Sequence, residues 1–413
     1  MRANFDWEWV ESQAARTAEV WRACEAQPFN GGHRFTALEQ EQREAAYDEA
    51  LHAIEGELRH PPRTGAARNS MREQAVATFG RFSANALDLE EPAIAMLTEE
   101  FLPIGTELAQ FARSFDPGLP MDSIIQACRN AWTACGLQPL LGQPVRLTPS
   151  ILAYSLLYPY SDNQLDDDSI TKERKLNFSR RFRQRLTGDK FVAATQTERA
   201  ISKLVGLIEE QYLREHFPQV YECLLSIHRA QEQSVWQMRN HNAYSDADTV
   251  RLSCQKGGSS VLADACLAQP FLSEEESRFA FEWGVLLQLG DDLQDVRDDL
   301  RRGSMTMFSH AAATKTNLDS LTMQLLRFAE HVGKRMDCLP HGSVVTKRLL
   351  KSSWRSLIIR AVADSHEFFS PGFVEQAERY SPFRFQFLRD RQERISSEQG
   401  LYRMMFEAFV QND

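Results

Sequence analysis

The segment from Gln288 to Gly303 carries a series of carboxylates at helical spacing. On an α-helix Asp291, Asp295 and Asp299 would lie one above another, with Asp292 beside Asp295. Such carboxylates repel each other by only about 0.2–0.5 kcal/mol per pair in water. In a cavity the repulsion grows and a counter-ion is needed. Mg²⁺ suits this pattern, because it prefers oxygen ligands and often binds substrate phosphates as well.

A second acidic stripe lies 129 positions earlier, where Asp162 and Asp166 are four residues apart and Asp167 follows. Tyr154 and Tyr158 continue the face of Asp162 toward the N-terminus. Basic residues come after both stripes: Lys172, Arg174 and Lys175 after the first, Arg301 and Arg302 after the second. A solvated helix end would explain either stripe alone. Two such stripes in one chain favour a shared cation site.

Together these motifs resemble those of the class I isoprenoid synthases, which ionise or join prenyl diphosphates. Asp291-Asp292-Leu293-Gln294-Asp295, preceded by Gln288, is similar to the DDxxD motif of polyprenyl diphosphate synthases. The overlapping segment from Asp295 to Gly303 resembles the D-V-x-E-D-x-R-R-G segment of squalene and phytoene synthases. Asp162-Asn163-Gln164-Leu165-Asp166 is similar to the DxxxD motif of that group. Lys256-Gly257-Gly258-Ser259-Ser260 resembles the K-T helix of polyprenyl synthases.

The resemblance implies an all-α isoprenoid synthase bundle with a central active-site cavity and three Mg²⁺ ions. It assigns the metal ligands to two walls: Asp162, Asp166 and Asp167 on one, and Asp291, Asp292, Asp295 and Asp299 on the other. Asp167 and Asp299 are the outer or third-metal candidates. Substrate contacts are expected from Lys256, Arg301, Arg302 and Gln288. Tyr154 and Tyr158 would line the prenyl pocket and face a carbocation with their rings.

Departures from the family patterns separate the alternatives. The chain has Cys254 to Gly258 where head-to-head synthases carry Y-C-x-x-V-A-G, and it lacks the G-K-R element that holds the second substrate of polyprenyl synthases. We therefore expect a class I terpene synthase that releases diphosphate and forms a terpene hydrocarbon or alcohol. One alternative is a prenyltransferase, either head-to-tail or head-to-head. The other is a non-catalytic helical bundle that binds partners through its acidic faces.

Composition agrees with a large helical enzyme. The 413 residues are 43% hydrophobic and have no linker-like tract, so we expect one continuous domain, with residues 1–140 as its N-terminal part and 141–413 as its catalytic core. The net charge of −10 disfavours nucleic acid as a partner. Seven cysteines without paired spacing and the lack of a secretory signal or a transmembrane segment predict a cytoplasmic protein. A homodimer is compatible with this reading.

Amphipathic periodicity predicts helices throughout. The expected ranges are 34–59, 69–88, 93–115, 121–136, 148–167, 170–187, 196–216, 218–240, 246–268, 273–300, 316–337, 343–367, 371–379 and 383–411, with a loop at 301–314. Thr148 and Ser273 are the expected N-caps of two of them. Gly257 and Gly258 inside a helix predict either close helix packing or room for a substrate.

Overall fold

The computed structural model describes residues 5–26, 32–58, 64–167, 169–237 and 246–397, with 400, 403, 406, 407 and 410 near the C-terminus. The side chains of residues 166, 234–237, 246–247 and 397 lie outside this description. Secondary structure in the described part is helical, with no strand, so the predicted all-α class is confirmed. No described helix combines the length and apolarity needed to cross a membrane.

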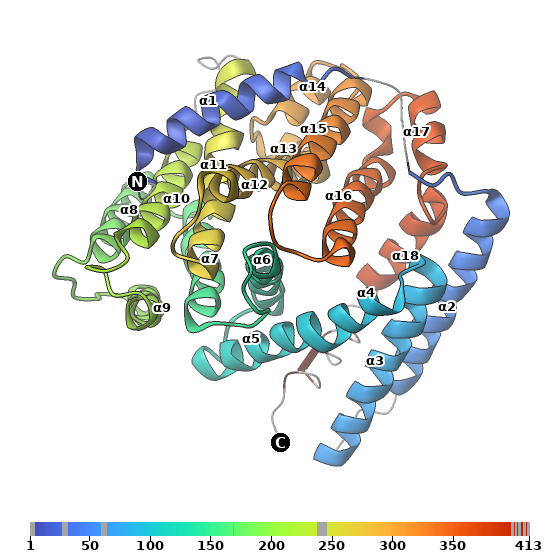
Figure 1. Cartoon of the computed structure of the whole chain (residues 1–413), viewed down its shortest axis with the longest axis horizontal. Helices are drawn as coiled ribbons and strands as arrows, with labels where there is room; N and C mark the ends of the chain where they lie inside the picture. The colour runs from blue at the N-terminus through green and yellow to red at the C-terminus, as the bar shows by residue number, and fades with distance from the viewer. Residues whose placement is uncertain are drawn as a thin grey trace.

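Five helices form the centre of the molecule (Figure 1): α6 (Met121–Leu140), α7 (Pro149–Asp166), α10 (Pro218–Gln237), α11 (Asp246–Ala268) and α12 (Glu274–Gln294). Helix α11 packs against the other four. Around them lie α1 (Trp7–Ala23), α8 (Lys172–Thr187), α9 (Gln196–Gln211), α13 (Val296–Arg302), α14 (Met307–Ala313), α15 (Asp319–Asp337), α16 (Val344–Asp364), η2 (His366–Phe368) and α17 (Pro371–Glu378).

The remaining helices form one side of the molecule. They are α2 (Ala37–Leu58), α3 (Gly65–Leu87), α4 (Glu91–Ala95), the π-helical turn η1 (Met96–Phe101), α5 (Leu102–Phe115) and α18 (Phe385–Ser397). Helices α2 and α3 lie side by side as a pair at the edge, and α4, η1 and α5 run on from them as one rod (Figure 1).

Ion pairs attach α18 to α2. Arg391 binds Asp48 at 2.6 Å, and Arg384 and Arg394 bind Glu44 and Glu55. Both glutamates are buried, so each needs its guanidinium partner. This row of contacts joins segments more than 330 residues apart in sequence.

Local sequence signals explain where the central helices begin. The Thr148 hydroxyl accepts a hydrogen bond from the backbone N–H of Ile151 at 3.3 Å, so the predicted N-cap of α7 is confirmed. Ser273 and Glu276 form the predicted capping box of α12, with bonds of 3.3 and 2.7 Å. Pro159 lies inside α7, which continues through it.

Several of the expected ranges differ from the structure. The predicted helix over 93–115 consists of α4, η1 and α5. Helix α1 was not predicted, because alanine and threonine rather than large apolar residues make up much of its buried face. The predicted helix over 273–300 is interrupted at Asp295, between α12 and α13. The predicted loop over 301–314 contains α14, which a capping box between Thr306 and Ser309 begins.

Helices α11 and α12 cross in close contact at two glycines. A Cβ atom on Gly257 would lie 2.4 Å from the Gly284 carbonyl oxygen and 2.4 Å from Cβ of Gln288. A Cβ atom on Gly284 would lie 2.0 Å from the Gly257 carbonyl oxygen. The two backbones are therefore in contact, and any side chain at either position would force them apart. The prediction that Gly257 allows close helix packing is confirmed.

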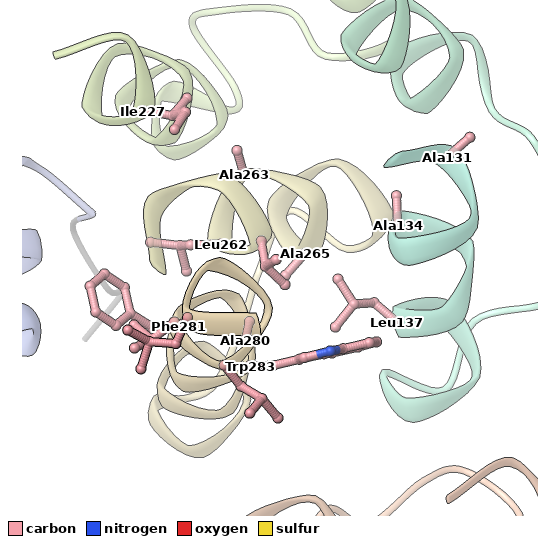
Figure 2. Close-up of a cluster of buried hydrophobic side chains, with 14 of the residues drawn as sticks. Ala131, Ala134, Leu137, Ile227, Leu262, Ala263, Ala265, Ala280, Phe281 and Trp283 are labelled. Carbon is pink, nitrogen blue, oxygen red and sulfur yellow. The ribbon is translucent and has the colours of Figure 1, made fainter. Parts of the chain in front are cut away.

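An apolar core surrounds this crossing (Figure 2). Figure 2 shows Leu137 of α6 pointing toward Ala265 of α11, with Trp283 of α12 reaching across beneath them to α6. All three side chains are at most 2% exposed. The contacts among α6, α11 and α12 are thus made mainly by apolar side chains.

The crossing generates a stability prediction. Gly257→Ala should lower the free energy of unfolding by about 1–3 kcal/mol, because the added methyl group overpacks a backbone contact. Gly206→Ala is the matched control, since nothing lies within 4 Å of a Cβ atom at this position of α9. The control should be neutral or stabilising by up to about 1 kcal/mol. Urea unfolding measures both, and equal effects would contradict the contact.

Candidate functional site

Four carboxylates near the end of α12 influence one another: Asp291, Asp292, Asp295 and Asp299, here called the acidic group. Burial, together with the charges of Asp292 and Asp295, raises the pKa of Asp291 to about 7. The same three causes raise the pKa of Asp299 to about 7. The predicted stripe is therefore brought together as an interacting set, although the helix is interrupted within it.

Backbone hydrogen bonds around Asp295 explain why the acidic residues remain on one face, although the helix is interrupted between α12 and α13. Asp295 N–H donates to the Asp291 carbonyl at 2.8 Å, and Asp299 N–H donates to the Asp295 carbonyl at 2.8 Å. These are i to i−4 bonds, as in an unbroken α-helix. The three residues consequently keep their helical spacing.

Asp292 is the anchored member of the group. Its carboxylate is buried and accepts hydrogen bonds from Gln288 Nε2 at 2.8 Å and from Ser253 Oγ of α11 at 2.9 Å. Burial raises its pKa, while these two donors act in the opposite direction. Gln288, predicted to contact the substrate, thus faces a carboxylate of its own helix.

Lys256 supplies a cationic side chain to the acidic group from α11. Its charge opposes the rise in pKa of Asp291, Asp292, Asp295 and Asp299 alike. The residue precedes Gly257, so the close crossing of α11 and α12 holds it beside the carboxylates. The expected contact of Lys256 with a substrate diphosphate stays a prediction.

The two arginines at the end of α13 differ in orientation. Arg302 is exposed and lowers the pKa of Asp295 and Asp299, so it lies near the acidic group. Arg301 is exposed and binds Asp298 at 2.9 Å. Of the predicted pair, Arg302 is therefore the one associated with the site.

The first acidic stripe reaches the acidic group through Tyr158. The Asp162 carboxylate is buried, accepts a hydrogen bond from Gln231 Nε2 of α10 at 2.5 Å and is hydrogen-bonded to Tyr158. The charge of Asp162, followed by burial and, more weakly, by the charge of Asp291, raises the pKa of Tyr158 well above its usual range. Tyr158 therefore lies between the two acidic motifs. Tyr154, one turn earlier, is buried.

The other two acids of the first stripe are placed less centrally. Asp166 is the last residue of α7, and its side chain lies outside the described part of the structure. Asp167 is exposed, and hydrogen bonds from the side chain of Ser169 and, at 2.8 Å, from its backbone N–H lower the pKa of this carboxyl. Its electrostatic partner is Lys175 rather than the acidic group.

Sequence reasoning missed Arg129. This residue of α6 is exposed, and its charge lowers the pKa of Asp291 and Asp295. It brings a cationic side chain from α6 to the acidic group. A single arginine on a helix otherwise rich in alanine was the available signal, but only the packing of α6 could show which residues it faces.

Asp291 reaches water, yet protein atoms surround its carboxylate closely enough for desolvation to be the main cause of its raised pKa. The charge of Arg129 on α6 acts on Asp291, and the charge of Asp291 acts on Tyr158 of α7. Side chains of α6, α7 and α12 therefore influence one another around Asp291.

The carboxylates of the acidic group suit hard divalent cations, which prefer oxygen ligands. A bound cation would offset the mutual repulsion that raises the pKa of these carboxylates. Their spacing is wider than a metal site needs. Within the described residues, no three acidic, histidine or cysteine side chains are gathered closely enough to hold a metal ion. Binding a cation would thus require the two walls to draw together.

Comparisons with models of known protein families, with curated proteins and with solved structures found no match to this chain.

The raised pKa values generate a pH prediction. The folded protein keeps protons on Asp291 and Asp299 that the unfolded chain releases above its ordinary value near 3.8. These groups therefore make the fold less stable as pH rises from about 4 to about 7. In metal-free buffer, Asp299→Asn should reduce the fall in melting temperature between pH 5 and pH 8.

The matched control for this experiment is Asp298→Asn, which removes an exposed neighbouring acid paired with Arg301. The control should follow the wild-type pH profile. Mg²⁺ should raise the melting temperature of the wild type more than that of Asp299→Asn, most clearly at pH 8, where the carboxylates are ionised. Identical pH profiles for wild type and Asp299→Asn would contradict the electrostatic coupling.

Proposed function

We propose that this protein is a class I terpene synthase, which ionises a linear prenyl diphosphate with Mg²⁺ and forms a terpene hydrocarbon or alcohol plus diphosphate. The observation that carries the proposal is the meeting of the two acidic motifs at Tyr158, which is hydrogen-bonded to Asp162 and senses the charge of Asp291. The motifs are 129 positions apart in sequence. Two solvated helix ends would have no reason to meet in the interior.

Residues of both walls would hold the metals. From α7 these are Asp162 and Asp166, and from α12 and α13 they are Asp291, Asp292, Asp295 and Asp299. Bound Mg²⁺ would stabilise the negative charge that develops on the leaving diphosphate. Hydrogen bonds from Gln288 and Ser253 hold Asp292 in place. Asp292 would therefore fix the position of a bound metal, while the other carboxylates would move to complete its coordination.

Cationic side chains on three helices would bind the diphosphate. Lys256, Arg302 and Arg129 all act on the acidic group, so an anion bound there with its metals would lie near all of them. Guanidinium groups form bidentate contacts with phosphates, and lysine contributes a compact charge. An anion of several charges is the natural ligand for such a mixed site.

The apolar part of the substrate would lie beneath the diphosphate. A carbocation reacts with any nucleophile within reach, so its surroundings must exclude water. Tyr154 and Tyr158 on one face of α7 would offer ring faces to the cation. Apolar side chains of α6, α11 and α12 make up the neighbouring core (Figure 2).

A prenyltransferase is the second candidate, because the segment from Asp291 to Asp295 resembles the DDxxD motif of polyprenyl diphosphate synthases. This candidate requires isopentenyl diphosphate for release of diphosphate, whereas the terpene synthase does not.

The test of the proposed function measures inorganic diphosphate. Purified protein should release it from at least one C10 to C25 prenyl diphosphate with Mg²⁺, without isopentenyl diphosphate. Asp162→Ala and Asp295→Ala should each lose at least about 100-fold in turnover, because each removes a metal ligand. Asp298→Ala, an exposed acid beside the group, is the control and should keep its activity.

Release that depends on isopentenyl diphosphate would select the prenyltransferase. No release from any of these substrates would leave a non-catalytic bundle. Near-normal turnover in a variant that combines Asp162→Ala with Asp295→Ala would refute the metal assignment.

A further prediction concerns the leaving group. Lys256→Met and Arg302→Met should weaken inhibition by inorganic diphosphate by about 1.5–3 kcal/mol each, the usual size of a charge-assisted contact. Arg301→Met serves as the control, because this neighbour of Arg302 is paired with Asp298 instead. Equal inhibition constants for Arg301→Met and Arg302→Met would remove Arg302 from the diphosphate site.

A further inference from the structure

Two uncharged donors hold the Asp162 carboxylate. Tyr158, one turn earlier on α7, is hydrogen-bonded to it, and Gln231 Nε2 of α10 donates to its Oδ1 at 2.5 Å. Asp162 and Gln231 are each 7% exposed, so water offers little replacement for these bonds. The carboxylate is thus held both from its own helix and from a neighbouring one.

Asp292 is held in the same way on the other wall of the site. One donor, Gln288, again lies one turn earlier on the same helix, and the other, Ser253, lies on the neighbouring helix α11. Each acidic motif therefore contains one buried aspartate that is fixed by a donor four residues before it and by a donor from a second helix. In this comparison Gln231 of α10 takes the place of Ser253 of α11.

The uncharged character of the Gln231 amide bears on cation binding. An arginine or lysine at this position would form an ion pair with Asp162 and compete with a bound cation for the carboxylate. The amide fixes the direction of the carboxylate and brings no net charge that would oppose a metal ion. Partners of this kind, which orient a ligand without binding the metal, raise metal affinity.

Gln231 is itself supported by contacts between α10 and α8. His228, three residues earlier on α10, donates from Nε2 to the Ser179 carbonyl at 3.0 Å, and its ring meets Phe182 edge-on, 4.9 Å between centroids. All three of these residues are buried. The contacts fix α10 in the turn that carries Gln231.

We propose that Gln231 is a positioning residue, which holds Asp162 in the direction needed to bind Mg²⁺ together with a diphosphate; this inference rests on the proposed function. Gln231 acts through Asp162 and is not itself a metal ligand. Its loss should therefore weaken metal binding but leave a ligand set that high Mg²⁺ concentrations can still fill. Loss of Asp162 removes a ligand, which excess metal cannot replace.

The experiment titrates Mg²⁺ into wild type and Gln231→Met in the presence of inorganic diphosphate and follows the melting temperature. Methionine keeps the length of the side chain and removes its donor. The half-saturating Mg²⁺ concentration should rise about 10- to 100-fold, the usual effect of replacing a partner of a metal ligand. Ser253→Ala should raise it in the same way, because it removes the corresponding donor to Asp292.

A turnover assay separates positioning from ligation. At saturating Mg²⁺, Gln231→Met should release diphosphate from a prenyl substrate within about threefold of the wild-type rate, whereas Asp162→Ala should stay at least about 100-fold lower. A loss in Gln231→Met that excess Mg²⁺ does not restore would overturn the positioning role.

The matched control is Gln219→Met. Gln219 lies on the same helix, is also 7% exposed and donates to the Pro270 carbonyl at 2.9 Å. Its replacement should lower the melting temperature and leave the half-saturating Mg²⁺ concentration unchanged. Equal Mg²⁺ responses of Gln219→Met and Gln231→Met would indicate no more than a structural role for Gln231 and overturn the proposal.

Should Gln231→Met fail to fold, Gln231→Asn takes its place, because its amide is one CH₂ group shorter and no longer reaches Asp162. It should also raise the half-saturating Mg²⁺ concentration, and a wild-type value would overturn the proposal. A wild type that binds Mg²⁺ with diphosphate but releases none from any prenyl substrate would refute the proposed function, while the melting experiment would still decide the role of Gln231. A wild type without any Mg²⁺ response would refute the metal assignment and this inference together.

Discussion

The backbone contact between Gly257 and Gly284 is the constraint on which the arrangement of the site depends. Only residues without a Cβ atom allow α11 and α12 to approach this closely. The approach places Lys256 beside the carboxylates of α12 and lets Ser253 reach Asp292. With the helices farther apart, the acidic group would lose cationic and hydrogen-bonding partners on α11, and its mutual repulsion would be less compensated.

The site combines a fixed carboxylate with adjustable ones. Asp292 accepts two hydrogen bonds and is buried, whereas Asp291 and Asp299 have pKa values of about 7 because their neighbours repel them. A cation would stabilise the ionised form of these two carboxylates and so favour release of their protons. The fold therefore stores unfavourable electrostatic energy at the place where the proposed reaction needs positive charge. This arrangement agrees with a site that closes around metals and an anion.

Interior polar contacts hold the walls of the site together. Asn130 of α6 donates hydrogen bonds to Ser155 of α7 and Asp264 of α11, at 3.1 and 3.2 Å. These three helices carry Arg129, Asp162 and Lys256, so the contacts help to fix the positions of these side chains relative to one another.

The sequence by itself determined the helical class, most helix positions and the spacing within each acidic stripe, because these depend on contacts three or four residues apart. It also marked Thr148 and Ser273 as caps, since capping is local. Only the tertiary structure decided that Ser253 binds Asp292 and that Arg129 lies near the acidic group. Those relations join helices far apart in the chain, and they follow from how closely the helices pack and how they are rotated, which no local spacing records.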